Sequence, residues 1–194
     1  MKLKPVVFLD RDGTINVEKG HIRSLDQFEL LAGAAKAIGS LNNAEVPVVV
    51  VTNQSGIARG FYSEDHVLAV NFKMRELLKV EGAHIDALFF CPHLPTGLVS
   101  QYSKKCHCRK PDIGLVEMAY ETDPELDRNR AYVVGDADSD MGLAFGCGAK
   151  AVLVETGKTK STEFDGSICK PHFVADSLMS AVNWILADLQ LGMN

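Results

Sequence analysis

The chain has 194 residues and a formal charge of −5, with 20 Lys and Arg residues against 25 Asp and Glu residues. Its hydrophobic fraction of 46% and its length suit a single globular domain over residues 1–194, which excludes a disordered or fibrous chain. The acidic balance argues against nucleic acid and anionic membranes as partners, and the longest apolar runs are far shorter than the ~20 residues of a membrane span.

Short apolar runs rich in Val and Phe predict five buried strands, because each run is apolar at consecutive positions instead of alternate ones. These runs are Val6–Leu9, Val48–Val51, Ala87–Phe90, Ala131–Val134 and Ala151–Val154. Helices are expected over Gly33–Asn42, Ser63–Glu81, Gly114–Tyr120, Ser139–Phe145 and Leu178–Leu189. The alternation of strands and helices predicts an α/β fold with three αβα layers, in which a doubly wound, mostly parallel sheet has helices on both faces.

Chemically distinctive residues follow the predicted strands, where the carboxyl ends of a parallel sheet open and ligands gather. The segments are Asp10-Arg11-Asp12-Gly13-Thr14, Thr52-Asn53-Gln54-Ser55, Arg109-Lys110 and Gly135-Asp136, with Asp140 four residues further on. Acids that converge from separate strands repel one another unless a hard cation lies between them, and Mg²⁺ prefers such oxygen ligands. Thr52, Arg109 and Lys110 can then hold a phosphoryl group beside the metal, and an Asp is a plausible nucleophile.

Three of the five cysteines lie in an irregular stretch between the third predicted strand and the next helix. The candidate ligands are Cys91, His93, Cys106 and Cys108. This set offers three sulfurs and one imidazole, which suits a closed, structural, tetrahedral zinc site in a loop at 91–108. His107 competes with His93, and we favour His93 because alternation points His107 away from Cys106 and Cys108.

The remaining cysteines, Cys147 and Cys169, are expected to be ordinary thiols. An odd number of cysteines, three of them grouped in one loop, argues against a disulfide framework and fits a reducing cytoplasm.

The four segments at the strand ends resemble the motifs of the haloacid-dehalogenase-like (HAD-like) phosphohydrolases, and the resemblance covers nearly the whole chain. It implies a HAD-like fold and a Mg²⁺-dependent phosphatase. Asp10 would attack phosphorus and carry the phosphate, while Asp12 would protonate the leaving alkoxide and then take a proton from water. Mg²⁺ would be held by Asp10, the Asp12 main-chain carbonyl and Asp136. Thr52 and Lys110 would stabilise the transferred group, and Asp140 would support the site.

Longer segments of the sequence narrow the resemblance to one family within this superfamily. Asp-Arg-Asp-Gly-Thr-Ile-Asn, Val-Thr-Asn-Gln-Ser-Gly-Ile-Ala-Arg-Gly, Cys-Pro-His and Cys-x-Cys-Arg-Lys-Pro resemble the heptose-bisphosphate and histidinol-phosphate phosphatase family. This implies removal of the 7-phosphate of D-glycero-D-manno-heptose 1,7-bisphosphate, a precursor of lipopolysaccharide heptose. The implied substrate contacts are Glu18, Lys19, Gly20, His21, Thr52, Asn53, Gln54, Ser55, Arg109 and Lys110. Ala137 stands where many relatives carry Lys or Arg, which removes one candidate cation for a second phosphate.

No long insertion follows the first motif, so no separate cap domain is expected, and the loops Glu18–Ser24 and Cys91–Cys108 would shape the pocket. The expected protein is a monomer that binds a small sugar phosphate. Histidinol-phosphate phosphatase is the alternative within the class. A non-catalytic, zinc-stabilised phospholigand-binding module is the alternative from another class. The presence of both Asp10 and Asp12 argues against the binding module, because binding alone needs no acid–base carboxylate. A DNA-end phosphatase is disfavoured by the acidic balance.

Overall fold

The computed structural model describes residues 3–157 and 170–191, so Cys169 lies outside the described residues. The strands are β1 (Lys4–Leu9), β2 (Val48–Asn53), β3 (Ala87–Cys91), β4 (Leu126–Gly135), β5 (Lys150–Val154) and β6 (Phe173–Ala175). The α-helices are α1 (Ala34–Asn43), α2 (Glu64–Val80), α3 (Gly114–Thr122), α4 (Asp138–Cys147) and α5 (Leu178–Leu191). The strands form one parallel sheet in the order β3-β2-β1-β4-β5-β6.

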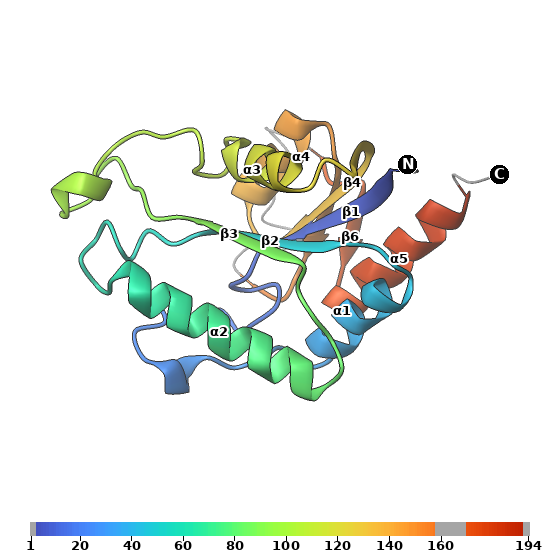
Figure 1. The fold of residues 1–194 in the computed structure, drawn as a ribbon, viewed down its shortest axis with the longest axis horizontal. Coiled ribbons are helices and arrows are strands. Elements are labelled where there is room, and N and C mark those ends of the chain that lie inside the picture. The colour runs from blue at the N-terminus through green and yellow to red at the C-terminus, as the bar shows by residue number, and fades with distance from the viewer. Residues whose placement is uncertain (1–2, 158–169, 192–194) are drawn as a thin grey trace.

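The sheet separates two apolar cores, because successive side chains of a strand point to opposite faces. In β1, Val7 and Leu9 pack with α1, α2 and α5 on one face. Val6 and Phe8 pack with α3 and α4 on the other face. Figure 1 shows these two helical layers on either side of the strands. The central strands β1, β2, β4 and β5 are therefore buried on both faces, which confirms the three-layer αβα fold expected from their continuous apolar runs.

Helix α2 shows how the sequence sets a local element. Ser63 caps it by accepting a hydrogen bond from the His66 main-chain N–H at 3.2 Å, and two acids occupy the first turn. Val67, Val70 and Met74 recur at three- and four-residue spacing and are buried. The helix therefore keeps one face against the sheet layer and the other toward solvent.

Strand β6 is the one strand of the described residues that the sequence did not predict. It has only three residues, it pairs with β5 at the sheet edge, and Val174 at its centre is exposed. So short an edge strand carries no apolar run that distinguishes it from a loop.

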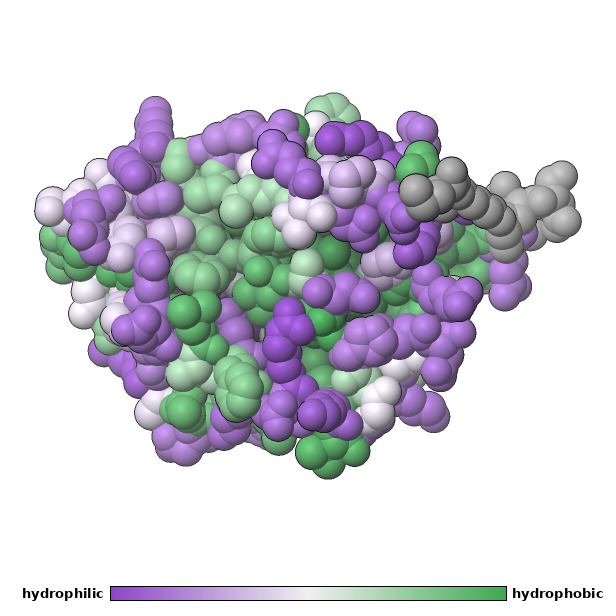
Figure 2. All heavy atoms as spheres, viewed as in Figure 1, coloured by the Kyte–Doolittle hydropathy of each residue, from purple (hydrophilic) through white to green (hydrophobic). Residues whose placement is uncertain are grey.

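The opposite edge of the sheet is β3, whose first four residues are only half-buried. Apolar side chains gather in the middle of the face that Figure 2 shows, with polar residues around them. Exposed apolar side chains of α2, such as Phe72 and Val80, also face solvent. Within the described ranges, no helix combines the length and the apolar character that crossing a membrane requires.

The strand order places the candidate residues together. The chain builds outward from β1 to β3 and then continues on the other side of β1 with β4, so β1 and β4 flank the point at which the order reverses. Ligands of open α/β sheets bind at this point, beyond the carboxyl ends of the strands. Asp10 follows β1 and Asp136 follows β4, and the Asp10 main-chain N–H donates to the Val134 carbonyl at 2.9 Å.

Candidate active site

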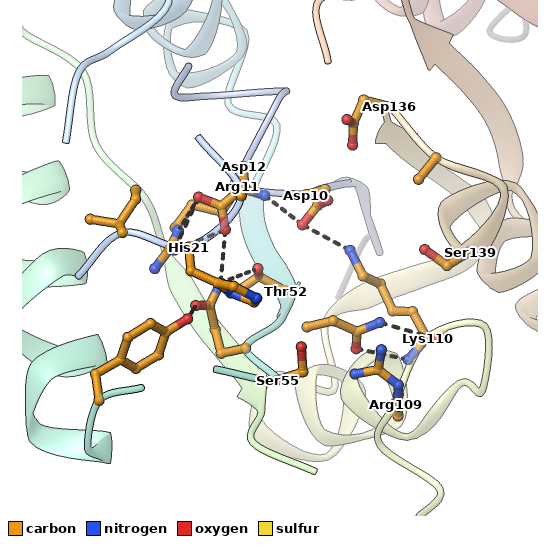
Figure 3. A pocket seen from close by; sticks show the side chains of 16 residues that line it. Asp10, Arg11, Asp12, His21, Thr52, Ser55, Arg109, Lys110, Asp136 and Ser139 are labelled. Atoms are coloured by element: carbon orange, nitrogen blue, oxygen red, sulfur yellow. Dashed lines mark hydrogen bonds and ion pairs between the residues drawn. The ribbon is translucent and has the colours of Figure 1, made fainter. Parts of the chain in front are cut away.

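A cavity of about 240 Å³ opens at the carboxyl ends of β1, β2 and β4. It is lined by Asp10, Arg11, Asp12, Gly20, His21, Ile22, Thr52, Asn53, Gln54, Ser55, Tyr62, Arg109, Lys110, Asp136, Ala137 and Ser139. Figure 3 shows that Asp12 and Lys110 lie on opposite sides of Asp10, with Asp136 above them in this view. Residues from all four sequence motifs therefore meet in one cavity.

Asp10 is held in one orientation by contacts to a single oxygen. Its Oδ1 accepts from the Arg11 main-chain N–H at 2.7 Å and from Lys110 Nζ at 2.8 Å. Its side chain keeps a small exposed fraction of 13%, toward the cavity. A carboxylate fixed in rotation and open on one side is well prepared to attack an electrophile in the cavity.

Lys110 is a fully buried cation between two carboxylates. Its ammonium group donates to Asp10 Oδ1 at 2.8 Å, to Asp140 Oδ1 at 2.6 Å and to the Val51 carbonyl at 2.9 Å. Burial acts to lower the pKa of Lys110, but the two carboxylates outweigh it, so the pKa is raised and the side chain stays charged. All three N–H groups are thus engaged by protein oxygens.

Asp140 is buried on the first turn of α4 and supports its neighbours. Its Oδ1 accepts from Lys110, and its Oδ2 accepts from the Ala137 main-chain N–H at 3.2 Å. Burial raises the pKa of Asp140, and the nearby Asp10 and Asp136 carboxylates act in the same direction, against the opposing effect of Lys110. Because protein donors engage both oxygens, Asp140 is better placed to orient Lys110 than to bind a ligand directly.

Three carboxylates form a group that suits a hard cation. One oxygen from each of Asp10, Asp136 and Asp140 lies within 4.8 Å of the others. The Asp136 carboxylate fits here because position 13 is a glycine. Gly13 has a φ of +83°, and a Cβ there would lie 2.4 Å from Asp136 Oδ2. Oxygen donors without sulfur or imidazole fit Mg²⁺ better than zinc. The residues present therefore fit the metal that the sequence predicts.

Asp12 lies on the other side of Asp10, away from Lys110 (Figure 3). Its Oδ2 accepts from Arg11 Nη2 and from Gln54 Nε2, both at 2.8 Å, and its Oδ1 accepts from Asn16 Nδ2 at 3.0 Å. Burial acts to raise the pKa of Asp12, but the Arg11 charge and these hydrogen bonds outweigh it, so the pKa is lowered. The side chain is thus a carboxylate that can accept a proton, oriented from three directions.

The loop after β2 joins the two halves of the cavity. Gln54 Nε2 also donates to Thr52 Oγ1 at 3.0 Å, while Gln54 Oε1 accepts from the Tyr62 hydroxyl at 3.3 Å. Asn53 exchanges two hydrogen bonds with the main chain of Lys110, at 3.0 and 3.1 Å. Because Thr52 Oγ1 accepts from Gln54, its own hydroxyl proton is directed elsewhere, and it can donate to a ligand.

The cysteine and histidine group lies at the end of β3 and in the loop that follows it to α3, and this loop extends away from the sheet at the left of Figure 1. Ligand atoms of Cys91, His93, Cys106 and Cys108 all lie within 4.8 Å of one another. Their sulfurs are 3.1 to 3.5 Å apart, and His93 Nδ1 is 3.4 Å from the Cys108 sulfur. Four ligands on one tetrahedral zinc would place sulfurs about 3.8 Å apart, so the group is close to this spacing.

His107 lies outside this group, as expected from the alternation. Its Nε2 contacts Glu117 Oε2 at 2.6 Å on the exposed side of α3. The loop between β3 and α3 reaches the cavity through Arg109, whose Nη1 donates to the main-chain carbonyl of His93 at 3.1 Å. A metal bound to His93 would therefore also fix the position of Arg109 in the cavity wall.

The implied substrate contacts divide into two groups. Gly20 and His21 line the cavity, as do the expected residues after β2 and before α3. Glu18 and Lys19 lie outside the lining, and Lys19 pairs with Glu29 at 3.0 Å.

Ile22 also lines the cavity and belongs to the loop Glu18–Ser24, which the sequence expected to shape the pocket. Four further lining residues were given no role by the sequence, namely Arg11, Tyr62, Ala137 and Ser139. The sequence marks the place of Tyr62 only indirectly, through the glycine at position 56. A Cβ on Gly56 would lie 2.3 Å from the Tyr62 hydroxyl oxygen, so a larger residue there would displace the ring.

The chain is similar to known proteins in both sequence and structure. The HAD-hydrolase-like family matches residues 107–181. A D-glycero-D-manno-heptose-1,7-bisphosphate 7-phosphatase of Thermosynechococcus vestitus is 39% identical over 193 residues, which cover 96% of this chain and 97% of the relative. A D-glycero-beta-D-manno-heptose-1,7-bisphosphate 7-phosphatase of Escherichia coli K12 is 39% identical over 168 residues, 86% of this chain and 87% of the relative.

Solved structures show the same similarity. The D,D-heptose 1,7-bisphosphate phosphatase from B. bronchiseptica, complexed with magnesium and phosphate, superposes with a TM-score of 0.84 at 32% identity, over 97% of this chain and 99% of the other. The corresponding enzyme from Burkholderia thailandensis gives a TM-score of 0.66 at 30% identity, over 95% and 99% of the two chains.

Proposed function

Because the chain belongs to the D-glycero-D-manno-heptose-1,7-bisphosphate 7-phosphatase family of HAD-like hydrolases, we propose that it removes the 7-phosphate of this sugar bisphosphate. The observation that carries the proposal is the placement of two carboxylates, Asp10 and Asp12, beside one cavity with different partners. Asp10 contacts Lys110 and belongs to the group of three carboxylates, whereas Asp12 accepts from Arg11, Asn16 and Gln54 on the side away from that group. The two acids can therefore take different roles.

In the first step, a carboxylate oxygen of Asp10 forms a bond to phosphorus as the bond between phosphorus and the sugar oxygen breaks. The leaving oxygen receives the electron pair of that bond and takes a proton from Asp12. Asp12 is a carboxylate before substrate binds, so it must gain this proton as the negatively charged substrate enters. An alkoxide is a poor leaving group, so this proton contributes roughly 10²–10⁴-fold to the rate. The sugar leaves as an alcohol, and Asp10 is left as an acyl phosphate.

In the second step, a water oxygen attacks the phosphorus of the acyl phosphate. Asp12 is now a carboxylate and takes a proton from that water, so it returns to its protonated form. The bond between Asp10 and phosphorus breaks, and inorganic phosphate and the Asp10 carboxylate are released. The hydrogen bonds from Arg11, Asn16 and Gln54 hold Asp12 in place for both transfers.

Lys110 and Thr52 assist the transfer in different ways. All three N–H groups of Lys110 have protein partners, so we propose that its charge, close to the Asp10 carboxylate, offsets the negative charge of the incoming phosphoryl group. Thr52 can donate its hydroxyl proton to a phosphoryl oxygen. Asp10, Asp136 and the Asp12 main-chain carbonyl would hold Mg²⁺. When bound, this ion would draw charge from the phosphoryl oxygens.

The remaining site residues would bind the rest of the sugar bisphosphate. We propose contacts from Glu18, Lys19, Gly20 and His21, from Asn53, Gln54 and Ser55, and from Arg109. Arg109 has no carboxylate partner among the described residues, so its guanidinium can donate hydrogen bonds to the second phosphate of the substrate. It would supply the positive charge that Ala137 does not. The loop at 91–108 would hold a structural zinc through Cys91, His93, Cys106 and Cys108.

The finer expectations belong to the same proposal: one HAD-like phosphatase domain over residues 1–194, with no separate cap, acting as a cytoplasmic monomer. Size-exclusion chromatography with light scattering measures the oligomeric state. A mass above that of one chain would contradict the monomer.

The test is phosphate release by the purified protein from D-glycero-D-manno-heptose 1,7-bisphosphate and from histidinol phosphate, with Mg²⁺ or with EDTA. We expect Mg²⁺-dependent release from the heptose, and ³¹P NMR should show loss of the 7-phosphate alone. Tenfold faster turnover of histidinol phosphate would reassign the substrate. Tight binding of both compounds without release would support a binding module instead.

A further inference from the structure

Arg11 is one of the largest fully buried side chains of the protein, and it is paired with Asp12, the next residue in the chain. Its Nη2 contacts both carboxylate oxygens, at 2.8 and 3.1 Å, and Nε adds a longer contact of 3.4 Å. Burial of a guanidinium lowers stability unless its charge is paired and its N–H groups are bonded. Because two planar groups that share such contacts fix each other's orientation, Arg11 sets the plane of the Asp12 carboxylate.

The other end of the guanidinium is held from a distant helix. Arg11 Nη1 donates to Asn71 Oδ1 at 2.9 Å, and Asn71 lies on α2, sixty residues further along the chain. The neighbours of Asn71 on the buried face of α2 are apolar, among them Val67, Val70 and Met74. Within the described residues, Asn71 Nδ2 has no hydrogen-bond partner. A buried amide whose NH₂ group makes no hydrogen bond lowers the stability of the fold. The contact of Asn71 Oδ1 with Arg11 is therefore the feature that explains an Asn at this position of α2.

We propose that Asn71 and Arg11 are positioning residues that aim Asp12 at the leaving oxygen of the substrate. Asn71 fixes the rotation of the guanidinium, and the guanidinium fixes the carboxylate plane. Asn71 does not line the cavity, so it can act on the reaction only through Arg11. This inference rests on the proposed function, because it assigns a purpose to the acid–base role of Asp12.

The proposal predicts an effect that depends on the leaving group. A sugar alkoxide needs a proton as the bond to phosphorus breaks, whereas p-nitrophenolate leaves readily without one. A poorly aimed Asp12 should therefore slow the sugar bisphosphate much more than p-nitrophenyl phosphate. The value of kcat/KM isolates this step, because it reports the steps up to the first irreversible one, here the release of the alcohol.

The experiment compares kcat/KM for D-glycero-D-manno-heptose 1,7-bisphosphate and for p-nitrophenyl phosphate in the wild type and in Asn71→Leu, both saturated with Mg²⁺. We expect the first value to fall roughly 10–100-fold, a part of what general acid–base catalysis supplies, and the second to fall less than about threefold. Asn71→Asp keeps an oxygen at the Oδ1 position that can accept from Arg11, and it should restore most of the lost rate.

Two further variants separate this role from a structural one. Val70→Ala removes apolar volume from the same face of α2, so it should lower the thermal stability without changing the ratio of the two kcat/KM values. Arg11→Lys keeps the charge but loses the parallel contacts, and it should change the ratio in the same direction as Asn71→Leu. It provides the test if Asn71→Leu does not fold.

A folded Asn71→Leu variant with the wild-type ratio would overturn the proposal, as would equal losses with both substrates. If Asn71→Leu does not fold, a wild-type ratio in Arg11→Lys would overturn it in the same way. Failure of the proposed function would be visible separately. In that case the wild type itself would release no phosphate from D-glycero-D-manno-heptose 1,7-bisphosphate.

Discussion

Replacing Lys110 with Met removes the buried cation between Asp10 and Asp140. At an effective dielectric constant of about 20, the contacts of 2.8 and 2.6 Å correspond to about 6 kcal/mol of attraction each, most of which offsets the desolvation of the three charges. Loss of one partner leaves two buried carboxylates without compensation, and such changes cost about 3–5 kcal/mol. For a chain of this length, the metal-free variant should melt roughly 6–20 °C below the wild type.

Mg²⁺ should restore much of this stability, because it supplies positive charge to the same carboxylates. The assay is thermal unfolding of wild type and Lys110→Met, in EDTA and in Mg²⁺, with Lys150→Met as a matched control. Lys150 pairs with Asp188 at the surface, so its loss should change stability by less than about 1 kcal/mol. Equal melting temperatures of Lys110→Met and wild type in EDTA would refute the reasoning, and so would an equal gain from Mg²⁺ in both.

Three other predictions concern the metals and the pH dependence of stability. Gly13→Ala would place a Cβ 2.4 Å from Asp136 Oδ2 and displace this carboxylate, so the Mg²⁺ concentration for half-maximal activity should rise by about 10–100-fold. An unchanged concentration would contradict the inference that Gly13 leaves room for a metal-binding Asp136. Cys106→Ser should lower the zinc content measured by elemental analysis, and a full equivalent of zinc would refute the ligand set. Burial acts to raise the pKa of Asp188, but its hydrogen bonds from Lys150 and Tyr132 outweigh it, so the pKa is lowered. The Asp188 carboxylate therefore contributes to the free energy of unfolding above the ordinary carboxyl pKa of about 4, and this contribution is lost as the pH falls. Urea unfolding should show that the difference in this free energy between wild type and Asp188→Asn becomes smaller at acid pH. A constant difference would contradict the assignment.

The fold could be predicted largely because its strands are buried on both faces. Four consecutive Val residues, Val48–Val51, occur where β2 contacts both cores, and no other ordinary element explains such a run. The helix α2 was equally clear, since its cap and its apolar spacing agree. Strand β6 has three residues, of which only Ala175 is buried, so it could not be distinguished from a loop.

Some residues of the candidate site could likewise be predicted from the sequence, and others could not. Asp10, Thr52 and Asp136 directly follow strands or end them, so topology alone brings them to one edge. Asn71 carries no such signal. Its contact with Arg11 spans sixty residues and exists only because α2 packs on the sheet, so no local spacing or motif reveals it.

The central claim is that Asp10 carries the phosphoryl group between the two steps. The direct test is rapid quenching during the first turnover of the heptose bisphosphate, followed by borohydride reduction and mass spectrometry of the peptide that contains Asp10. An acyl phosphate is reduced to homoserine, so the account predicts homoserine at position 10 in the wild type and none in Asp10→Asn. Phosphate release with an unmodified Asp10 at every quench time, or release by Asp10→Asn at the wild-type rate, would contradict it.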